Sequence, residues 1–299
     1  MQNLKNTKFV FFQGGSNTRI GNTLVWFSNA HDWCVKNGFT FLFPQKNSVF
    51  SNLFSESNRA FEASNRSFGN QCEQPFISLI QGCGQRVAKF LAEKEDGFWL
   101  SELILDGILY VKFTGRIWNP SPSLVEYFRA FNTVIVEEPF PFLLETGSQG
   151  NSLILSNEAL SYCEKITTQY KNLISVHIRQ GDYKRWNNGI YYRSDEFYNS
   201  LLSKLKNQFP DKSIKFMHNG EFKVNEENRK LAMHYDANDE LTYELADFLA
   251  LASSETIIGP LSTFTAQAQI IGKVQLHKKN RLININPEDD VDSLVSKLH

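Results

Sequence analysis

Residues 175–183 read SVHIRQGDY, and this stretch decides the expected fold. From Ile174 to Arg179, apolar residues alternate with polar ones, which is the period-two pattern of a β-strand. In an open α/β sheet, ligands bind outside the carboxyl ends of the strands. His177 and Arg179 therefore face the same crevice, where imidazole can hydrogen-bond a sugar or a base and the guanidinium fits phosphate oxygens. A strand-end histidine and arginine that bind neighbouring carbonyl and carboxylate groups would show the same spacing, so the pattern alone leaves both interpretations open.

Predicted strands and helices alternate along both halves of the chain. Near the N-terminus, apolar strands over 8–12 and 39–43 enclose a helical stripe over 24–34, and Gly38 follows as the expected residue after the helix end. A strand, a helix and a strand within this length predict a parallel βαβ unit. The remaining predicted elements are helices over 76–92 and 123–130, strands over 109–113 and 133–136, and then in alternation a helix over 156–169, a strand over 173–179, a helix over 194–208, a strand over 213–217, a helix over 239–253, a strand over 256–259 and a last helix that ends at Ile271.

This alternation is typical of an α/β protein with doubly wound parallel sheets. A polar, glycine-rich stretch over 145–151 separates the two halves and marks the expected domain boundary. We therefore expect two Rossmann-like domains that face a cleft, over residues 1–150 and 151–299.

Composition argues against several classes of protein. The 299 residues carry a formal charge of -1, which argues against nucleic acid as the main partner. The four cysteines form no C-x-x-C pair, so free thiols in a reducing compartment are expected rather than disulfides or a zinc site. No apolar run reaches the length of a secretory signal or a membrane span. We expect a cytoplasmic protein without a transmembrane segment, for which peripheral contact with a membrane stays open.

A glycine-rich loop enters the first predicted helix. Residues 13–22 read QGGSNTRIGN, in which small side chains would let the backbone approach a ligand and free N–H groups would favour an anion. The glycine spacing differs from the G-x-G-x-x-G of dinucleotide-binding loops, which argues against an unrelated Rossmann oxidoreductase. A tight turn without a ligand would account for the same residues.

Three separated motifs resemble those of the inverting α1,2-fucosyltransferases, whose wider superfamily includes α1,6- and protein O-fucosyltransferases. Residues 177–183 resemble the H-x-R-R-G-D-Y motif of this family, and residues 19–22 (RIGN) resemble its R-L-G-N loop. Asp247, followed fifteen residues later by Ser262-Thr263-Phe264, is similar to the third motif. The resemblance covers residues 9–43 and 172–272.

The resemblance implies a two-domain GT-B type fold in which the second domain binds GDP-fucose as the donor and the first lies on the acceptor side. It implies that neither a metal nor another cofactor is needed. In this family the arginine that matches Arg179 contacts the β-phosphate of the donor. The other matched donor-binding residues are Gly21 and Asn22 beside the pyrophosphate, Ser262 and Thr263 at a helix N-terminus that cradles phosphate, and His177 and Asp247 at the nucleoside end.

Several residues have both a functional and a structural interpretation. Asp182 directly follows the predicted strand end, so it is a candidate catalytic base, although an aspartate there can also form a turn by bonding its own backbone. Asp247 lies away from the apolar face of its helix, where a carboxylate is usually solvated. Trp118 and Trp186 are candidate acceptor-binding residues, because exposed indole rings can pack against sugars.

These observations together predict an inverting, metal-independent glycosyltransferase that moves fucose from GDP-fucose to a hydroxyl of an oligosaccharide acceptor, in an α1,2-type or related linkage. Two alternatives remain. Gln180 replaces the second arginine of the motif and residues 217–220 read MHNG where the family has S-D-D, so the donor could be a different nucleotide sugar. A non-catalytic protein that binds a sugar nucleotide or a glycan on the same fold is the other alternative.

Overall fold

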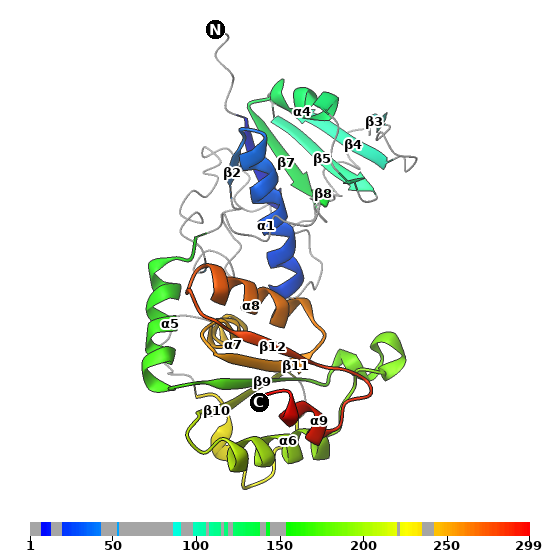
Figure 1. Ribbon diagram of the computed structural model, residues 1–299. Helices are drawn as coiled ribbons and strands as arrows, with labels where there is room; N and C mark the ends of the chain where they lie inside the picture. Colours follow the sequence, from blue (N-terminus) through cyan, green and yellow to red (C-terminus); the bar gives the residue numbers. More distant parts are fainter. Residues whose placement is uncertain are drawn as a thin grey trace. The chain divides into compact units, whose positions relative to one another are not determined.

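The protein is described by a computed structural model in which two compact units, Met1–Ser156 and Asn157–His299, are each described by themselves (Figure 1). The described residues are 7–12, 20–42, 53, 86–90, 98–105, 108–114, 117–118, 122–137, 142–143, 154–219, 222–234 and 242–299. The glycine-rich loop over 13–19 therefore lies outside them. In the described residues, no helix combines the length and the apolar character needed to cross a membrane.

The second unit is built around a four-stranded sheet in which all neighbouring strands run parallel. This arrangement confirms the parallel α/β fold that was predicted for this half of the chain. The strands, in their order across the sheet, are β10 (Ile214–Asn219), β9 (Ile174–Arg179), β11 (Thr256–Pro260) and β12 (Arg281–Ile285).

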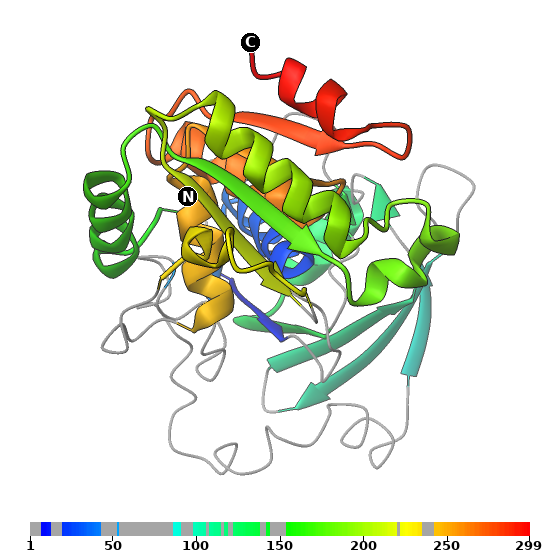
Figure 2. The same ribbon diagram turned by 90° about the horizontal axis from the view of Figure 1, so that it is seen from below.

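Helices cover both faces of this sheet (Figures 1 and 2). Ile174, Val176 and Ile178 are buried in a core that includes leucines of the helices on one face. On the opposite face, the hydroxyls of Ser175 and Ser254 lie 2.6 Å apart. The helices of the first face are α6 (Asp195–Gln208) and α9 (Val291–Ser296), those of the second are α7 (Tyr243–Ala252) and α8 (Thr263–Val274), and α5 (Asn157–Gln169) packs against α7.

Side-chain caps fix where these helices begin. The Ser194 hydroxyl accepts a hydrogen bond from the Phe197 N–H at the start of α6, and the Thr242 hydroxyl accepts one from the Leu245 N–H at the start of α7. Such caps satisfy N–H groups that have no partner inside the helix. The helices predicted to start near residues 156 and 194 begin at Asn157 and Asp195, so both predicted starts are confirmed to within one residue.

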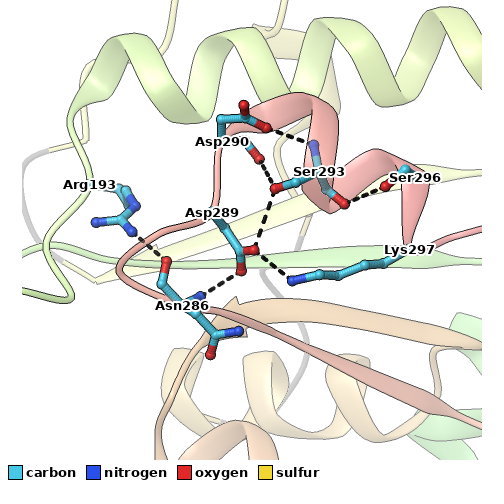
Figure 3. A network of polar contacts seen from close by, with 7 residues as sticks. All are labelled: Arg193, Asn286, Asp289, Asp290, Ser293, Ser296 and Lys297. Atoms are coloured by element: carbon cyan, nitrogen blue, oxygen red, sulfur yellow. Dashed lines mark hydrogen bonds and ion pairs between the residues drawn. The ribbon is translucent and has the colours of Figure 1, made fainter.

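The C-terminal segment adds β12 and α9, which the sequence patterns did not indicate. Figure 3 shows the turn between them, where the Asp289 carboxylate accepts hydrogen bonds from the Asn286 N–H (2.8 Å) and from the Lys297 ammonium (2.6 Å). Arg193, from the segment before α6, donates to the Asn286 carbonyl in the same network. The C-terminal segment is thus hydrogen-bonded, through Arg193, to the residues that precede α6.

The first unit contains a mixed sheet, so the prediction of a fully parallel sheet was wrong for this half. Four neighbouring strands are parallel, but the last two pair in antiparallel fashion. In sheet order the strands are β2 (Thr40–Leu42), β1 (Lys8–Phe12), β7 (Thr133–Glu137), β5 (Ile108–Thr114), β4 (Phe98–Leu105) and β3 (Arg86–Phe90). Other elements are α1 (Ile20–Lys36), α4 (Pro122–Arg129), β6 (Ile117–Trp118) and β8 (Phe142–Leu143).

A hairpin accounts for the antiparallel part. Leu105 of β4 pairs with Ile108 of β5, so only two residues connect the strands, and a two-residue connection joins antiparallel rather than parallel neighbours. The connecting residues are Asp106-Gly107, a strong sequence signal for a hairpin. The predicted helix over 76–92 was also wrong in its described part, because Arg86–Phe90 forms β3.

Candidate functional site

The carboxyl end of β9 carries the residues that the sequence singled out. Because the apolar residues of β9 enter the α6 and α9 face, His177 and Arg179 lie on the face of α7 and α8. His177 pairs in register with Met217 of β10, and Arg179 pairs with Asn219. The candidate site of the second unit is therefore built on this edge of the sheet, where α/β proteins bind ligands.

Arg179 is held in place by its own chain. Its Nε donates to Oδ1 of Asp182 at 3.1 Å, and its Nη2 donates to Oδ2 of the same carboxylate at 2.7 Å. The guanidinium carbon also lies 4.6 Å from the centroid of the Tyr183 ring. The arginine side chain is 16% exposed and that of Asp182 is 40% exposed, so the ion pair lies at the surface of the second unit.

An aromatic stack extends outward from Arg179. The rings of Tyr183 and Trp186 lie 5.0 Å apart and those of Trp186 and Tyr191 lie 5.2 Å apart, each pair at a shallow angle. The Tyr183 hydroxyl donates to the carbonyl of Leu261 at 2.5 Å, which joins this stack to the loop between β11 and α8. Trp186 is 45% exposed. Of these three rings, only Trp186 was predicted from the sequence as a site residue, although the aromatic spacing of the segment after β9 could have indicated the other two.

A short lobe of two 3₁₀ turns, Asp182–Lys184 and Trp186–Gly189, carries Tyr183 and Trp186 of this stack and projects from the end of β9 (Figures 1 and 2). Gln180 lies at its base, buried, and its Nε2 donates to the Arg193 carbonyl at 3.2 Å and to Oδ1 of Asp195 at 2.8 Å. The residue that departs from the family motif thus points away from Arg179 and closes the base of the lobe.

His177 is packed from two sides. It is 5% exposed, and its ring lies 5.1 Å from that of Phe264 in α8. A Cβ atom on Gly259 would lie 3.3 Å from the Cβ of His177 and 3.1 Å from a methyl of Thr265, so a side chain at position 259 would push into both. This glycine in β11 therefore leaves room for the His177 side chain and lets α8 pack closely on the sheet.

Asp247 is half-buried rather than fully solvated, contrary to the expectation from its helical face, and its Oδ1 atom is buried. Desolvation raises the pKa of its carboxyl group to about 7. Among the described residues, its buried Oδ1 has no hydrogen-bond partner. The next residue, Phe248, packs against Phe264 at 5.5 Å, and Phe264 also packs against His177. A buried carboxylate oxygen without a partner is costly, which makes it a candidate acceptor for a ligand.

Two asparagines that were not predicted as site residues share this property. The Oδ1 atoms of Asn219 and Asn284 are buried and accept no hydrogen bond from any described residue. Asn219 is the partner of Arg179 across β10 and β9, and Asn284 is the partner of Gly259 across β12 and β11. Asn219 ends β10 and lies in the M-H-N-G stretch over 217–220, and Asn284 lies near the carboxyl end of β12; these positions are the signals that could have indicated them.

Ser262 caps α8. Its hydroxyl accepts a hydrogen bond from the Thr265 N–H at 3.3 Å, and its carbonyl accepts one from the Thr265 hydroxyl at 3.1 Å. Thr263 is exposed at the first position of the helix. The N-terminus of this 12-residue helix provides partial positive charge close to the loop that Tyr183 contacts.

The remaining predicted residues belong to the first unit. Gly21 and Asn22 lie in the first turn of α1, and Trp118 lies in β6; the side chains of Asn22 and Trp118 are outside the described part of the chain. Their contribution to a shared site stays a prediction. The described residues contain no group of three or more His, Cys, Asp or Glu side chains that could hold a metal ion.

Comparison with known proteins identifies the fold. No family model and no curated protein sequence matches the chain. Among solved structures, the chain resembles apo POFUT1 with a TM-score of 0.55 and 11% identity over 94% of this chain and 99% of that one. POFUT1 in complex with GDP-fucose matches with a TM-score of 0.55 and 12% identity over the same shares. POFUT1 in complex with GDP matches with a TM-score of 0.53 and 12% identity, also over 94% and 99%.

Proposed function

We propose that this protein is an inverting glycosyltransferase that transfers fucose from GDP-fucose to a hydroxyl group of an oligosaccharide acceptor. The observation that carries the proposal is Arg179, a partly exposed guanidinium held at the carboxyl end of β9 on a fold shared with POFUT1. POFUT1 has been solved with GDP-fucose and with GDP. The sequence resemblance adds the H-x-R, Gly-Asn and Ser-Thr-Phe motifs in the same order.

In this proposal, residues 151–299 bind the donor and residues 1–150 bind the acceptor, as two GT-B type domains. Arg179 contacts the β-phosphate, and the N-terminus of α8 at Ser262 and Thr263 adds partial positive charge. The sequence resemblance assigns Gly21 and Asn22 to the same pyrophosphate.

The nucleoside end of the donor would lie against His177 and Asp247. Guanine presents N–H donors on its Watson–Crick edge, and the buried Oδ1 of Asp247 is an acceptor without a protein partner among the described residues. Burial would strengthen such a hydrogen bond because little water competes for either group. The adjacent N1–H and N2–H groups of guanine can donate to one carboxylate together, whereas uracil has a single N–H donor on that edge, which supports a preference for guanosine.

The reaction requires stabilisation of a departing diphosphate. The bond between fucose C1 and the β-phosphate oxygen breaks, the acceptor oxygen bonds to C1 from the opposite side, and the hydroxyl proton passes to a base. A fixed guanidinium and a helix N-terminus can stabilise the charge that develops on GDP without a metal ion. The sequence resemblance, which implies no metal, is the support for this metal-independent mechanism.

The acceptor would bind beside this centre. Trp186 and Tyr191 offer exposed and half-buried ring surface on the lobe next to Arg179, and Trp118 is the candidate of the first domain. Aromatic faces pack well against the apolar side of a sugar ring. An α1,2-type or related linkage is part of the proposal because the motifs resemble the α1,2 family.

A non-catalytic binder of sugar nucleotides is the second candidate. Both oxygens of Asp182, the carboxylate proposed from the sequence as the base, already accept hydrogen bonds from Arg179. A donor other than GDP-fucose also remains an alternative, because Gln180 contributes no positive charge to the site.

Calorimetric titration with GDP, UDP, CDP and NAD tests the proposal. We expect GDP to bind best and Arg179→Ala to weaken GDP binding by at least about tenfold, since a charge-assisted contact to phosphate is lost. Arg229→Ala, which removes an arginine from an exposed ion pair with Glu226, is the matched control and should leave the affinity unchanged. A preference for NAD would contradict the proposal, and release of fucose from GDP-fucose would separate the enzyme from the binder.

A further inference from the structure

The two bidentate edges of the Arg179 guanidinium are in different situations. One edge, formed by Nε and Nη2, donates both of its hydrogen bonds to the Asp182 carboxylate. The other edge includes Nη1, which donates to no acceptor within the described part of the chain. Because the side chain is 16% exposed, a ligand can reach it. An arginine has five N–H donors in a fixed fork, so this second edge can still take a planar pair of oxygens.

The plane of the guanidinium is fixed as well. It lies over the Tyr183 ring at 4.6 Å, and the Tyr183 ring is held by its hydroxyl bond to Leu261 and by its contact with Trp186. Asp182 fixes rotation within the plane, and Tyr183 fixes the plane itself. A side chain with several rotatable bonds thereby loses its freedom before any ligand binds, which lowers the entropic cost of binding.

We propose that Asp182 is a positioning residue that directs the free edge of Arg179 toward a phosphate oxygen pair, and that it is not the general base. This inference rests on the proposed function, because the phosphate is that of the GDP moiety. It replaces the role that the sequence suggested for Asp182.

The chemistry of the pair supports this assignment. A general base must offer a lone pair to the acceptor hydroxyl, whereas both oxygens of Asp182 are engaged by cationic N–H donors. Accepting a proton would remove the charge that holds Arg179 at the moment when the departing diphosphate needs it. The position of Asp182 also suits a positioning role. It lies three residues after Arg179, on the turn that begins the lobe, so the ion pair forms between neighbouring residues of one segment.

Titration of the full chain with GDP and with GMP tests this inference. Asp182→Asn keeps the size of the side chain but cannot accept from Nε and Nη2 together, so the guanidinium is no longer aligned. We expect GDP affinity to fall about tenfold, the loss typical of one charge-assisted hydrogen bond. GMP lacks the β-phosphate, so its affinity should stay within about twofold, which also shows that the variant is folded.

A double-mutant cycle distinguishes positioning from a general structural effect. If Asp182 acts through Arg179, then Asp182→Asn should have no further effect on GDP affinity once Arg179→Ala is present. Glu226→Gln is the matched control, because Glu226 forms an exposed ion pair with Arg229 at the same three-residue spacing. It should leave both affinities unchanged.

Other outcomes would overturn the inference. Tighter GDP binding by Asp182→Asn would mean that the carboxylate competes with phosphate for Arg179. Unchanged binding together with loss of turnover, and loss of the acidic limb of the pH profile of kcat, would identify Asp182 as the base. Failure of the wild-type chain to bind GDP would instead refute the proposed function, so the two failures can be told apart.

Discussion

Burial changes the chemistry of a single carboxylate in this protein. Asp247 was expected on a solvated helix face, but α7 lies against the sheet and α8, and desolvation raises the pKa of its carboxyl group from 3.8 to about 7. The raised pKa means that the folded protein favours the protonated carboxyl. A ligand that donates hydrogen bonds to this group would favour the ionised form instead, so ligand binding and ionisation of Asp247 are coupled.

The pH dependence of stability tests the environment of Asp247. Between pH 3.8 and about 7, the unfolded chain ionises this carboxyl while the folded protein keeps it protonated, so its contribution lowers the free energy of unfolding as the pH rises. Asp247→Asn removes that slope. Above about pH 7, we expect the variant to be more stable than the wild type by on the order of 1–4 kcal/mol.

Urea unfolding at a series of pH values measures this difference. Glu244→Gln, one helical turn earlier on the exposed start of α7, is the control and should leave the slope unchanged. Parallel stability curves for Asp247→Asn and the wild type would contradict the desolvation of Asp247 in the structure.

At the level of elements, close packing of α7 against α8 depends on one glycine. A Cβ atom added to Gly272 of α8 would lie 2.0 Å from the Asn280 side-chain nitrogen and 2.3 Å from the carbonyl oxygen of Ala252. That nitrogen donates to the same Ala252 carbonyl at 3.0 Å, which ties the end of α7 to the segment before β12. The glycine therefore permits a contact on which the placement of both helices depends.

Substitution of this glycine tests the contact. Gly272→Ala should lower the free energy of unfolding by about 2–4 kcal/mol, because overpacking also breaks a buried hydrogen bond. Gly181→Ala is the control, since a Cβ there would meet no atom within 4 Å and the backbone φ is negative. It should change stability by less than about 0.5 kcal/mol in the same chemical unfolding experiment. Equal effects of the two variants would be inconsistent with the structure.

At the scale of the whole molecule, the second unit is closed by its own C-terminus. Leu294 and Val295 of α9 are buried in the core under β9, and the ring of His299 lies 5.3 Å from that of Phe209 after α6. The network of Figure 3 links this segment to Arg193 and hence to the base of the lobe. Arg193 therefore joins the C-terminal segment to Gln180 at the base of the lobe, so loss of this segment is expected to disturb the proposed site.

Asp289 is the centre of this closure, and its side chain in the ion pair with Lys297 is only 6% exposed. Burial by itself raises its pKa, but hydrogen bonds from Lys297 and Asn286 together lower it. Its contribution to stability is therefore present above its ordinary pKa and is lost as the pH falls below that value. We expect Asp289→Ala to lower the free energy of unfolding near neutral pH by about 1–3 kcal/mol, as for a broken partly buried network.

Chemical unfolding at neutral and at acidic pH measures the effect of Asp289→Ala. Asp292→Ala is the matched control, because Asp292 pairs with Lys204 but its side chain is 76% exposed. Its effect should stay below about 1 kcal/mol. A cost for Asp289→Ala that does not shrink in acid would show that the carboxylate charge is not what holds the segment.

The sequence by itself determined the parallel sheet of the second unit. The alternation in Ile174–Arg179 and the capping residues Ser194 and Ser262 act over a few residues, so local physics places them. For the same reason, Gly38, whose φ is +70°, was predicted correctly after α1. The dipeptide Asp106-Gly107 is also a hairpin signal in the sequence. The prediction of a fully parallel first sheet was wrong because this turn signal was not used.

Only the tertiary structure decided the environment of the site. The burial of Asp247 depends on which helix covers which strand, and the bond from Tyr183 to Leu261 joins residues 78 positions apart. The Arg179–Asp182 pair is local, yet the arginine could equally have turned toward another partner. Desolvation and side-chain direction are properties of packed neighbours, and one-dimensional patterns do not contain those neighbours.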